Sequence, residues 1–106
     1  MMRKLFRGAI LETVLLSLIS DAAEDGLHGY GVFLAVQKKY GVRLGQSTLY
    51  PELAQLERQS LIESSWGIVD GKARRVFRIT QKGHSLLRKY SAELKMVVPA
   101  ITRALV

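Results

Sequence analysis

Uncharged side chains that form directional hydrogen bonds gather on one face of residues 46–58. Leu49, Leu53 and Leu56 recur at positions i, i+4 and i+7, which predicts an α-helix with one apolar stripe. The side away from the leucines carries Ser47, Thr48, Pro51, Gln55 and Arg58, with Tyr50 on its flank and Gln46 at its entrance. Hydroxyl and amide groups of this kind read base edges in the major groove of DNA. Taken alone, however, the pattern is more typical of an ordinary solvated helix.

The first turn of this helix carries two further signals. Ser47 is a favourable N-cap residue, because its hydroxyl can accept hydrogen bonds from free amides of the first turn. Pro51 is then expected in the first turn, where its ring meets only the carbonyl of the cap residue. If the helix inserts deeply into a groove, Gln55 is the candidate for an amide–adenine pair, and Gln46 and Tyr50 are nearer the phosphates.

A basic ribbon is predicted directly after the helix. Residues 63–69 and 72–79 each have the pattern of a β-strand, and Asp70-Gly71 between them is a strong turn dipeptide. Cations cluster near that turn, at Lys72, Arg74 and Arg75. A helix followed by a ribbon with a basic tip is the winged-helix arrangement, in which the helix enters a groove and the ribbon's cations reach neighbouring phosphates.

These residues resemble those of PadR-type transcriptional regulators over roughly Leu11 to Leu87. The shared elements are His28-Gly29-Tyr30, Ser47-Thr48-Leu49-Tyr50-Pro51, Leu61-Ile62-Glu63-Ser64, Trp66 and Gly71-Lys72-Ala73-Arg74-Arg75-Val76-Phe77-Arg78-Ile79-Thr80. The resemblance implies a dimeric winged-helix repressor whose C-terminal helix makes the dimer, as in the smaller PadR subfamily with one terminal helix. The sequence departs from the family at Val76-Phe77, where two aromatics are usual, and at Ala73, where proline is common; neither departure changes a charge.

Composition restricts the class of protein. The chain has 106 residues, enough for one modest domain, and a formal charge of +7, which favours a polyanionic partner. It has no cysteine and only two histidines, His28 and His84, so we expect no thiolate or histidine metal site and no cofactor. There is also no plausible catalytic triad, paired acid and base, or phosphate loop, and we expect no enzymatic activity.

The N-terminal half is expected to supply two more helices. Residues 8–20 are predicted to form an amphipathic helix with a wide apolar stripe. Because Glu12 interrupts the apolar run, we expect neither a signal peptide nor a membrane span, and we expect a cytoplasmic protein. Arg3, Lys4 and Arg7 precede it, as a DNA-contacting arm or a solvated tail. The segment His28-Gly29-Tyr30-Gly31 opens a helix that runs through Tyr40. We expect the side chain of Tyr40 to face inward. Amides near Gly29 and the Tyr30 hydroxyl could hold a phosphate.

The last helix is predicted to begin after a Thr80 cap. It carries apolar residues at 3- and 4-residue spacing, typical of a seam between subunits: Leu87, Tyr90, Leu94, Val97, Ile101 and Leu105. Pro99 interrupts the seam and should bend or end the helix. We therefore divide the chain into a winged helix-turn-helix domain, residues 1–80, and a dimerisation helix, residues 81–106.

The predicted fold is mainly α with a two-stranded β wing, and the predicted function is sequence-specific binding of double-stranded DNA at an inverted repeat by a homodimeric repressor. A winged-helix module that binds protein instead of DNA is the alternative. A small aromatic or drug-like effector is possible, and Trp66 could line an aromatic cleft for it. We expect instead that Trp66 packs in the core or against the wing.

Overall fold

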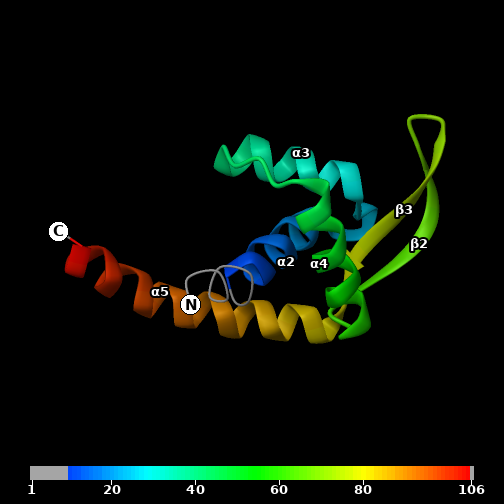
Figure 1. Ribbon diagram of the computed structural model, residues 1–106. Helices are drawn as coiled ribbons and strands as arrows, with labels where there is room; N and C mark the ends of the chain where they lie inside the picture. Colours follow the sequence, from blue (N-terminus) through cyan, green and yellow to red (C-terminus); the bar gives the residue numbers. More distant parts are fainter. Residues whose placement is uncertain (1–9, 106) are drawn as a thin grey trace.

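Three helices and a small sheet enclose one apolar core in the computed structural model, which describes residues 10–105. The helices of this unit are α2 (Leu11–Asp21), α3 (Gly29–Tyr40) and α4 (Gln46–Arg58), with a 3₁₀ turn, η2 (Ala23–Asp25), after α2. The strands are β1 (Leu27–His28), β2 (Ile62–Val69) and β3 (Lys72–Ile79), and the chain continues into α5 (Gln81–Leu105). The winged-helix arrangement is therefore confirmed, with the wing projecting from one side and α5 along the base (Figure 1).

The core is built from the stripes that the sequence predicts. Helix α4 buries Leu49, Leu53 and Leu56 completely or almost so, against five buried residues of α2: Leu11, Leu15, Leu16, Leu18 and Ile19. Each buried side chain of this size contributes about 1.5–3 kcal/mol relative to exposure. Because this one cluster holds α2, α3 and α4 together, the outward face of α4 has a fixed orientation.

The sheet has one more strand than predicted. Its order is β1-β3-β2, all antiparallel, with Leu27 opposite Phe77 and His28 opposite Val76. The helix was expected to open at His28, but His28 and Leu27 instead pair with β3, and the helix begins at Gly29. Gly26 permits this approach, since its φ of +69° is open to glycine and a Cβ there would lie 2.6 Å from the Phe77 carbonyl oxygen.

The wing turn and the helix ends follow the sequence closely. Asp70 and Gly71 have φ values of 52° and 76°, as a tight hairpin turn requires. Gly41 ends α3 in the left-handed conformation, with its amide donating to Gln37. Thr80 caps α5 through a 3.0 Å hydrogen bond from the Gly83 amide to its hydroxyl. The predicted Thr80 cap, the pair of strands joined by Asp70-Gly71 and the end of the helix at Tyr40 are confirmed.

Three local predictions are wrong. Gly45, not Ser47, is the N-cap of α4, so Pro51 lies in the second turn and withholds a donor from the Ser47 carbonyl. Tyr40 is exposed instead of inward. Trp66 is 71% exposed, because its row of the ribbon extends past the core. Pro99 was predicted to bend or end α5, and the helix does not end there.

Helix α5 extends well beyond the domain. It continues through Pro99 to Leu105, since a proline within a helix removes one hydrogen bond without stopping propagation when the flanking turns are favourable. In Figure 1 the second half of α5 projects past helices α2–α4 and rises at its end. In the described part of the chain no helix is long and apolar enough to cross a membrane. The predicted basic arm, Arg3, Lys4 and Arg7, lies outside the described residues, as do residues 8 and 9 of the predicted first helix.

Candidate nucleic-acid interface

The outward face of α4 presents the predicted polar side chains. Gln46, Ser47 and Tyr50 are exposed, and Thr48 and Gln55 are half-buried on the same helix. The amide oxygen of Gln55 accepts a 2.6 Å hydrogen bond from Arg58 Nη2. Gln55 therefore keeps its amide NH₂ group as the free donor, and Arg58 brings a cation beside it. The sequence placed Arg58 on this face but did not pair it with Gln55, since side-chain pairing three residues apart is only one of several rotamer outcomes.

Tyr50 and Gly29 join the start of α3 to the flank of α4. A Cβ built on Gly29 would lie 2.5 Å from Tyr50 Cε1 and 2.9 Å from the Tyr50 hydroxyl oxygen, so the tyrosine ring occupies the space of a side chain at position 29. Tyr30 follows and stacks on Phe33, with ring centroids 5.8 Å apart. Tyr30 and Tyr50 are both exposed, and the Tyr50 ring lies against the start of α3, the helix that carries Tyr30.

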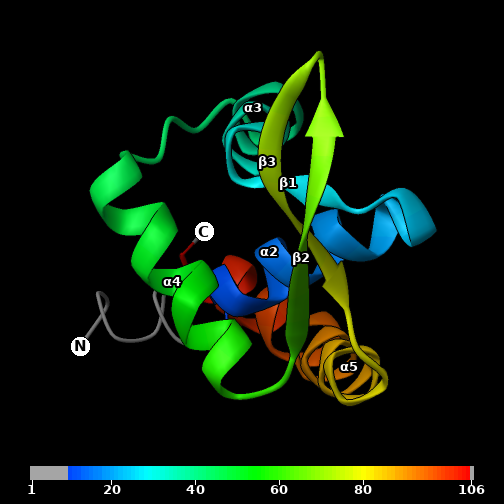
Figure 2. The ribbon, with the colours of Figure 1, turned by 90° about the vertical axis from the view of Figure 1, so that its right-hand side faces the viewer.

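The wing separates its cations onto two faces. Arg75 is directly opposite Trp66 and Arg74 is directly opposite Gly67, so the two arginines point to opposite sides, as their adjacency in the strand requires. Lys72, at the tip, is on the same face as Arg74. Figure 2 shows the ribbon running past α4 and ending clear of the helices.

Arg75 is engaged within the protein. Its Nη2 atom lies 3.8 Å from Glu57 Oε2 of α4, and its guanidinium lies 5.7 Å from the ring centroid of Trp66. Ser64, two residues before Trp66 on the same face of the ribbon, donates a short hydrogen bond to the same carboxylate oxygen. No pattern in the sequence indicates Glu57 at this site, because the contact joins residues 18 positions apart through tertiary packing.

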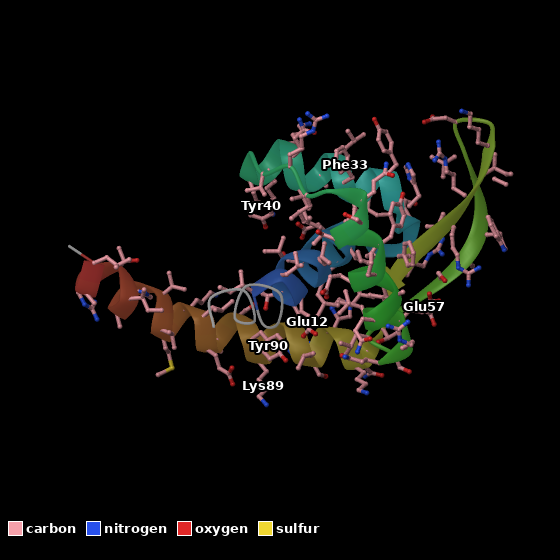
Figure 3. All side chains as sticks on the ribbon, in the orientation of Figure 1. Glu12, Phe33, Tyr40, Glu57, Lys89 and Tyr90 are labelled. Carbon is pink, nitrogen blue, oxygen red and sulfur yellow. The ribbon has the colours of Figure 1, made fainter. Side chains whose placement is uncertain are left out.

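The predicted seam of α5 divides into two parts. Leu87 packs against the core of its own chain, and Tyr90 donates a hydrogen bond to Glu12 of α2, beside which it lies in Figure 3. Leu94 is half-buried. Val97 and Ile101, farther along, are exposed on the projecting half of the helix. The unpartnered apolar stripe is therefore shorter than predicted and begins near Leu94.

Glu12 has an unusual environment for a carboxyl group. Burial raises its pKa above the usual 4.5, the nearby charge of Glu52 raises it further, and the hydrogen bond from Tyr90 opposes both effects. Burial, followed by the charge of Glu12, likewise raises the pKa of the Tyr90 hydroxyl. These three residues come from α2, α4 and α5, so the group lies where the three helices meet. Within residues 10–105 there is no cluster of three or more histidine or acidic side chains arranged to hold a metal ion.

Comparison with known proteins identifies relatives along most of the chain. Residues 15–89 match the family described as transcriptional regulator PadR-like. The transcriptional regulator Rv3488 of Mycobacterium tuberculosis is 37% identical over 86 residues, which cover 81% of this chain and 76% of the relative.

Solved structures agree with this fold. A PadR-like transcriptional regulator from Bacillus cereus superposes with a TM-score of 0.81 at 24% identity, covering 94% of this chain and 95% of that one. A PadR family transcriptional regulator from Eggerthella lenta gives a TM-score of 0.73 at 28% identity, covering 99% and 88%. At 24% identity, the likeness to the Bacillus cereus protein concerns the fold alone. The two alignments extend over the wing and the long last helix as well as the core.

Proposed function

Since this chain belongs to the PadR-like family of transcriptional regulators, we propose that it acts as a homodimeric repressor that binds an inverted-repeat operator. The outward face of α4 is the observation that carries this proposal. It offers neutral hydrogen-bonding groups at Thr48 and Gln55, which gain little from polyanion attraction and are suited to discriminating among bases. The positive charge that supplies general affinity lies elsewhere, on the wing and the helix ends.

The contacts to DNA divide into two kinds. Thr48 and Gln55, with Ser47 beside them, would meet base edges, whereas Gln46, Tyr30 and Tyr50 near the helix starts would meet phosphate. Lys72 and Arg74 on the wing would reach the phosphates beside the groove. A protein-binding winged helix would instead present large aliphatic side chains on the face of α4, whereas its exposed residues include Gln46, Ser47 and Arg58, and its exposed aromatic, Tyr50, carries a hydroxyl.

Dimer formation would use the projecting half of α5. Its apolar residues repeat on one side of the helix, at Leu94, Val97, Ile101 and Leu105. Two such stripes bury each other when helices pair, and residues 81–106 would then be the dimerisation unit beside the DNA-binding unit, residues 1–80. In a symmetric dimer the two α4 helices would meet half-sites about 34–36 Å apart.

An apolar cavity supports a small aromatic effector. The cavity has a volume of about 190 Å³ and lies between α2, α3 and the segment that leads into α4. Its lining is Leu11, Val14, Val36, Tyr40, Val42 and Leu44. Engineered apolar cavities of about 150 Å³ accept benzene, so this volume suits a molecule with one aromatic ring. A ligand there would press on residues 41–45 and so shift the start of α4.

Selection of bound fragments from random duplex DNA tests the function most directly. We expect recovery of a short inverted repeat, and titration of the full chain with that repeat and with a scrambled duplex at one salt concentration should show a large difference in affinity. Recovery of no common sequence, with equal affinity for both duplexes, would contradict a sequence-specific repressor.

A further inference from the structure

One cation of the wing is held by a carboxylate of the DNA-reading helix. Arg75 Nη2 lies 3.8 Å from Glu57 Oε2, and Glu57 is in the last turn of α4, on the side that faces the strands in Figure 3. In the part of the chain that the structure describes, the ion pairs are this one and Lys39–Asp21. Glu57–Arg75 is therefore the ion pair there that joins the wing to a helix.

Two neighbours on the same face of the ribbon hold this pair in place. Ser64 donates to the Glu57 carboxylate oxygen that faces Arg75, which fixes the orientation of the carboxylate. Trp66, directly opposite Arg75, has its ring 5.7 Å from the guanidinium carbon, within the range of a cation–π contact. We call Glu57, Ser64, Trp66 and Arg75 the wing clamp.

The wing clamp is the last support of the ribbon before its tip. The next pair on this face is Ile68 and Ala73, both exposed, with Ile68 at 75%. A two-stranded ribbon without packing is only marginally stable by itself. Its direction relative to α4 is therefore set at the row of Trp66 and Arg75, where the ion pair with Glu57 joins the ribbon to the helix.

The other two wing cations are differently placed. Lys72 and Arg74 lie on the opposite face of the ribbon from Arg75. Neither forms an ion pair within residues 10–105. Lys72 is exposed and Arg74 is half-buried. These two cations can meet phosphate without first giving up an internal carboxylate.

We propose that Arg75 is a positioning residue, which sets the angle between the wing and α4, and that Lys72 and Arg74 make the wing's phosphate contacts. This inference rests on the proposed DNA-binding function. It differs from a count of basic residues, which would assign all three cations to phosphate. Its first test needs no DNA, so it gives an answer even if the proposed function is wrong.

The first test uses the tryptophan of the wing clamp, which is the only tryptophan in the chain. Steady-state fluorescence anisotropy of Trp66 in the free, full-length protein reports how firmly the ribbon is held. Glu57→Gln keeps an acceptor for Ser64 but removes the ion pair, and we expect the anisotropy to fall. Arg75→Gln should lower it further, because this variant also removes the cation over the ring, and Arg75→Lys should retain most of the wild-type value.

Glu63→Gln is the matched control, because it makes the same charge change as Glu57→Gln but lies in β2, on the ribbon face opposite to Ser64 and Trp66, where Glu63 is exposed. We expect wild-type anisotropy from it. Circular dichroism checks that every variant is folded. Wild-type anisotropy in folded Arg75→Gln, or an equal decrease in Glu57→Gln and Glu63→Gln, would overturn the proposal.

The second test assigns the phosphate contacts. In the proposed homodimer, one substitution removes a phosphate contact from each subunit, so the slope of log affinity against log salt concentration should become smaller in magnitude by about 1.8. We expect this change of slope for Lys72→Gln and for Arg74→Gln, and weaker binding with the wild-type slope for Arg75→Gln. A slope smaller by about 1.8 in Arg75→Gln would show that Arg75 contacts phosphate directly and would overturn its assignment as a positioning residue.

Discussion

The ring of Tyr50 fills the space that a side chain at position 29 would need, with Tyr50 Cε1 2.5 Å from a Cβ built there. Glycine at this position lets the start of α3 and the flank of α4 lie against each other. The two sequence elements that mark the chain, His28-Gly29-Tyr30 and Thr48-Leu49-Tyr50-Pro51, are therefore the two sides of one contact.

Gly29→Ala should displace the Tyr50 ring. Because the atoms that a methyl group would meet are at the far end of a side chain, the ring can swing outward, and we expect little change in folding stability. Affinity for the operator should fall, since Tyr50, an exposed tyrosine of α4, has moved. A double-mutant cycle with Tyr50→Ala measures this: Gly29→Ala should have almost no further effect once Tyr50 is removed. Fully additive effects would show that Gly29 acts independently of Tyr50.

Thr48→Ala and Gln55→Ala should reduce specificity more than general affinity. A direct base contact contributes about 1–3 kcal/mol of discrimination against the wrong base pair. We expect each variant to bind the selected operator more weakly by an amount in that range and to bind scrambled duplex almost as well as the wild type, in paired titrations at one salt concentration. Gln37→Ala, an exposed glutamine on α3, is the control. Equal weakening on both duplexes would mean that α4 holds DNA without reading it.

Truncation after Tyr90 should separate folding from dimerisation. The shortened chain keeps the packing of Leu87 on the core and the hydrogen bond from Tyr90 to Glu12, but it lacks Leu94, Val97 and Ile101. We expect a folded monomer, detected by light scattering with circular dichroism as the check on folding. A stable dimer of the truncated chain would place the subunit interface elsewhere.

Glu12→Gln should change how stability depends on pH. The folded-state pKa of Glu12 is raised by burial and by Glu52, so the folded protein binds this proton over a range in which the unfolded chain has released it. The stability that Glu12 contributes is thus full below its unfolded-state pKa and is lost as pH rises through the folded-state pKa. The glutamine does not ionise and still accepts from Tyr90, so its advantage over the wild type should grow as pH rises from the unfolded-state pKa through the raised folded-state pKa.

Urea titrations at several pH values provide that measurement, with Glu63→Gln as the control for an exposed carboxyl group. The difference in the free energy of unfolding between Glu12→Gln and the wild type should rise with pH, and this rise is compared with the difference measured for Glu63→Gln. Parallel pH profiles for Glu12→Gln and the wild type would contradict a raised pKa.

Val14→Phe should fill the apolar cavity between α2 and α3. A ligand at 100 times its Kd stabilises the folded state by about 2.7 kcal/mol, which raises the melting temperature measurably. We expect a panel of single-ring aromatic compounds to contain one that stabilises the wild type and not Val14→Phe. Equal shifts in both proteins would place the ligand at a different site.

The sequence predicts most of the elements here because their signals are local. The leucine spacing of α4, the Asp70-Gly71 turn and the Thr80 cap each act within a few residues, and all three are confirmed. Strand β1 has only two residues and depends on pairing with β3 some fifty residues later, so no local pattern predicts it.

Long-range contacts explain the other differences. Trp66 was expected to pack in the core or against the wing, yet the strand carries it past the edge of the core, where Arg75 is its neighbour. Tyr90 has the spacing of a subunit seam, but Glu12 of its own chain meets it first. In both cases the partner belongs to another element, and the spacing of residues within one helix or strand does not identify it.

A single residue, Thr80, separates the end of β3 from the start of α5, and a Cβ at Gly83 would overlap the carbonyl oxygen of Leu61. The joint therefore has no room to adjust. One residue inserted after Thr80 would turn the exposed stripe of α5 by about 100° and move it about 1.5 Å along the helix axis. In the proposed dimer, the two α4 helices would then face different sides of the duplex. In that dimer the length of this joint would set the operator spacing that the protein accepts, although none of its atoms need touch DNA.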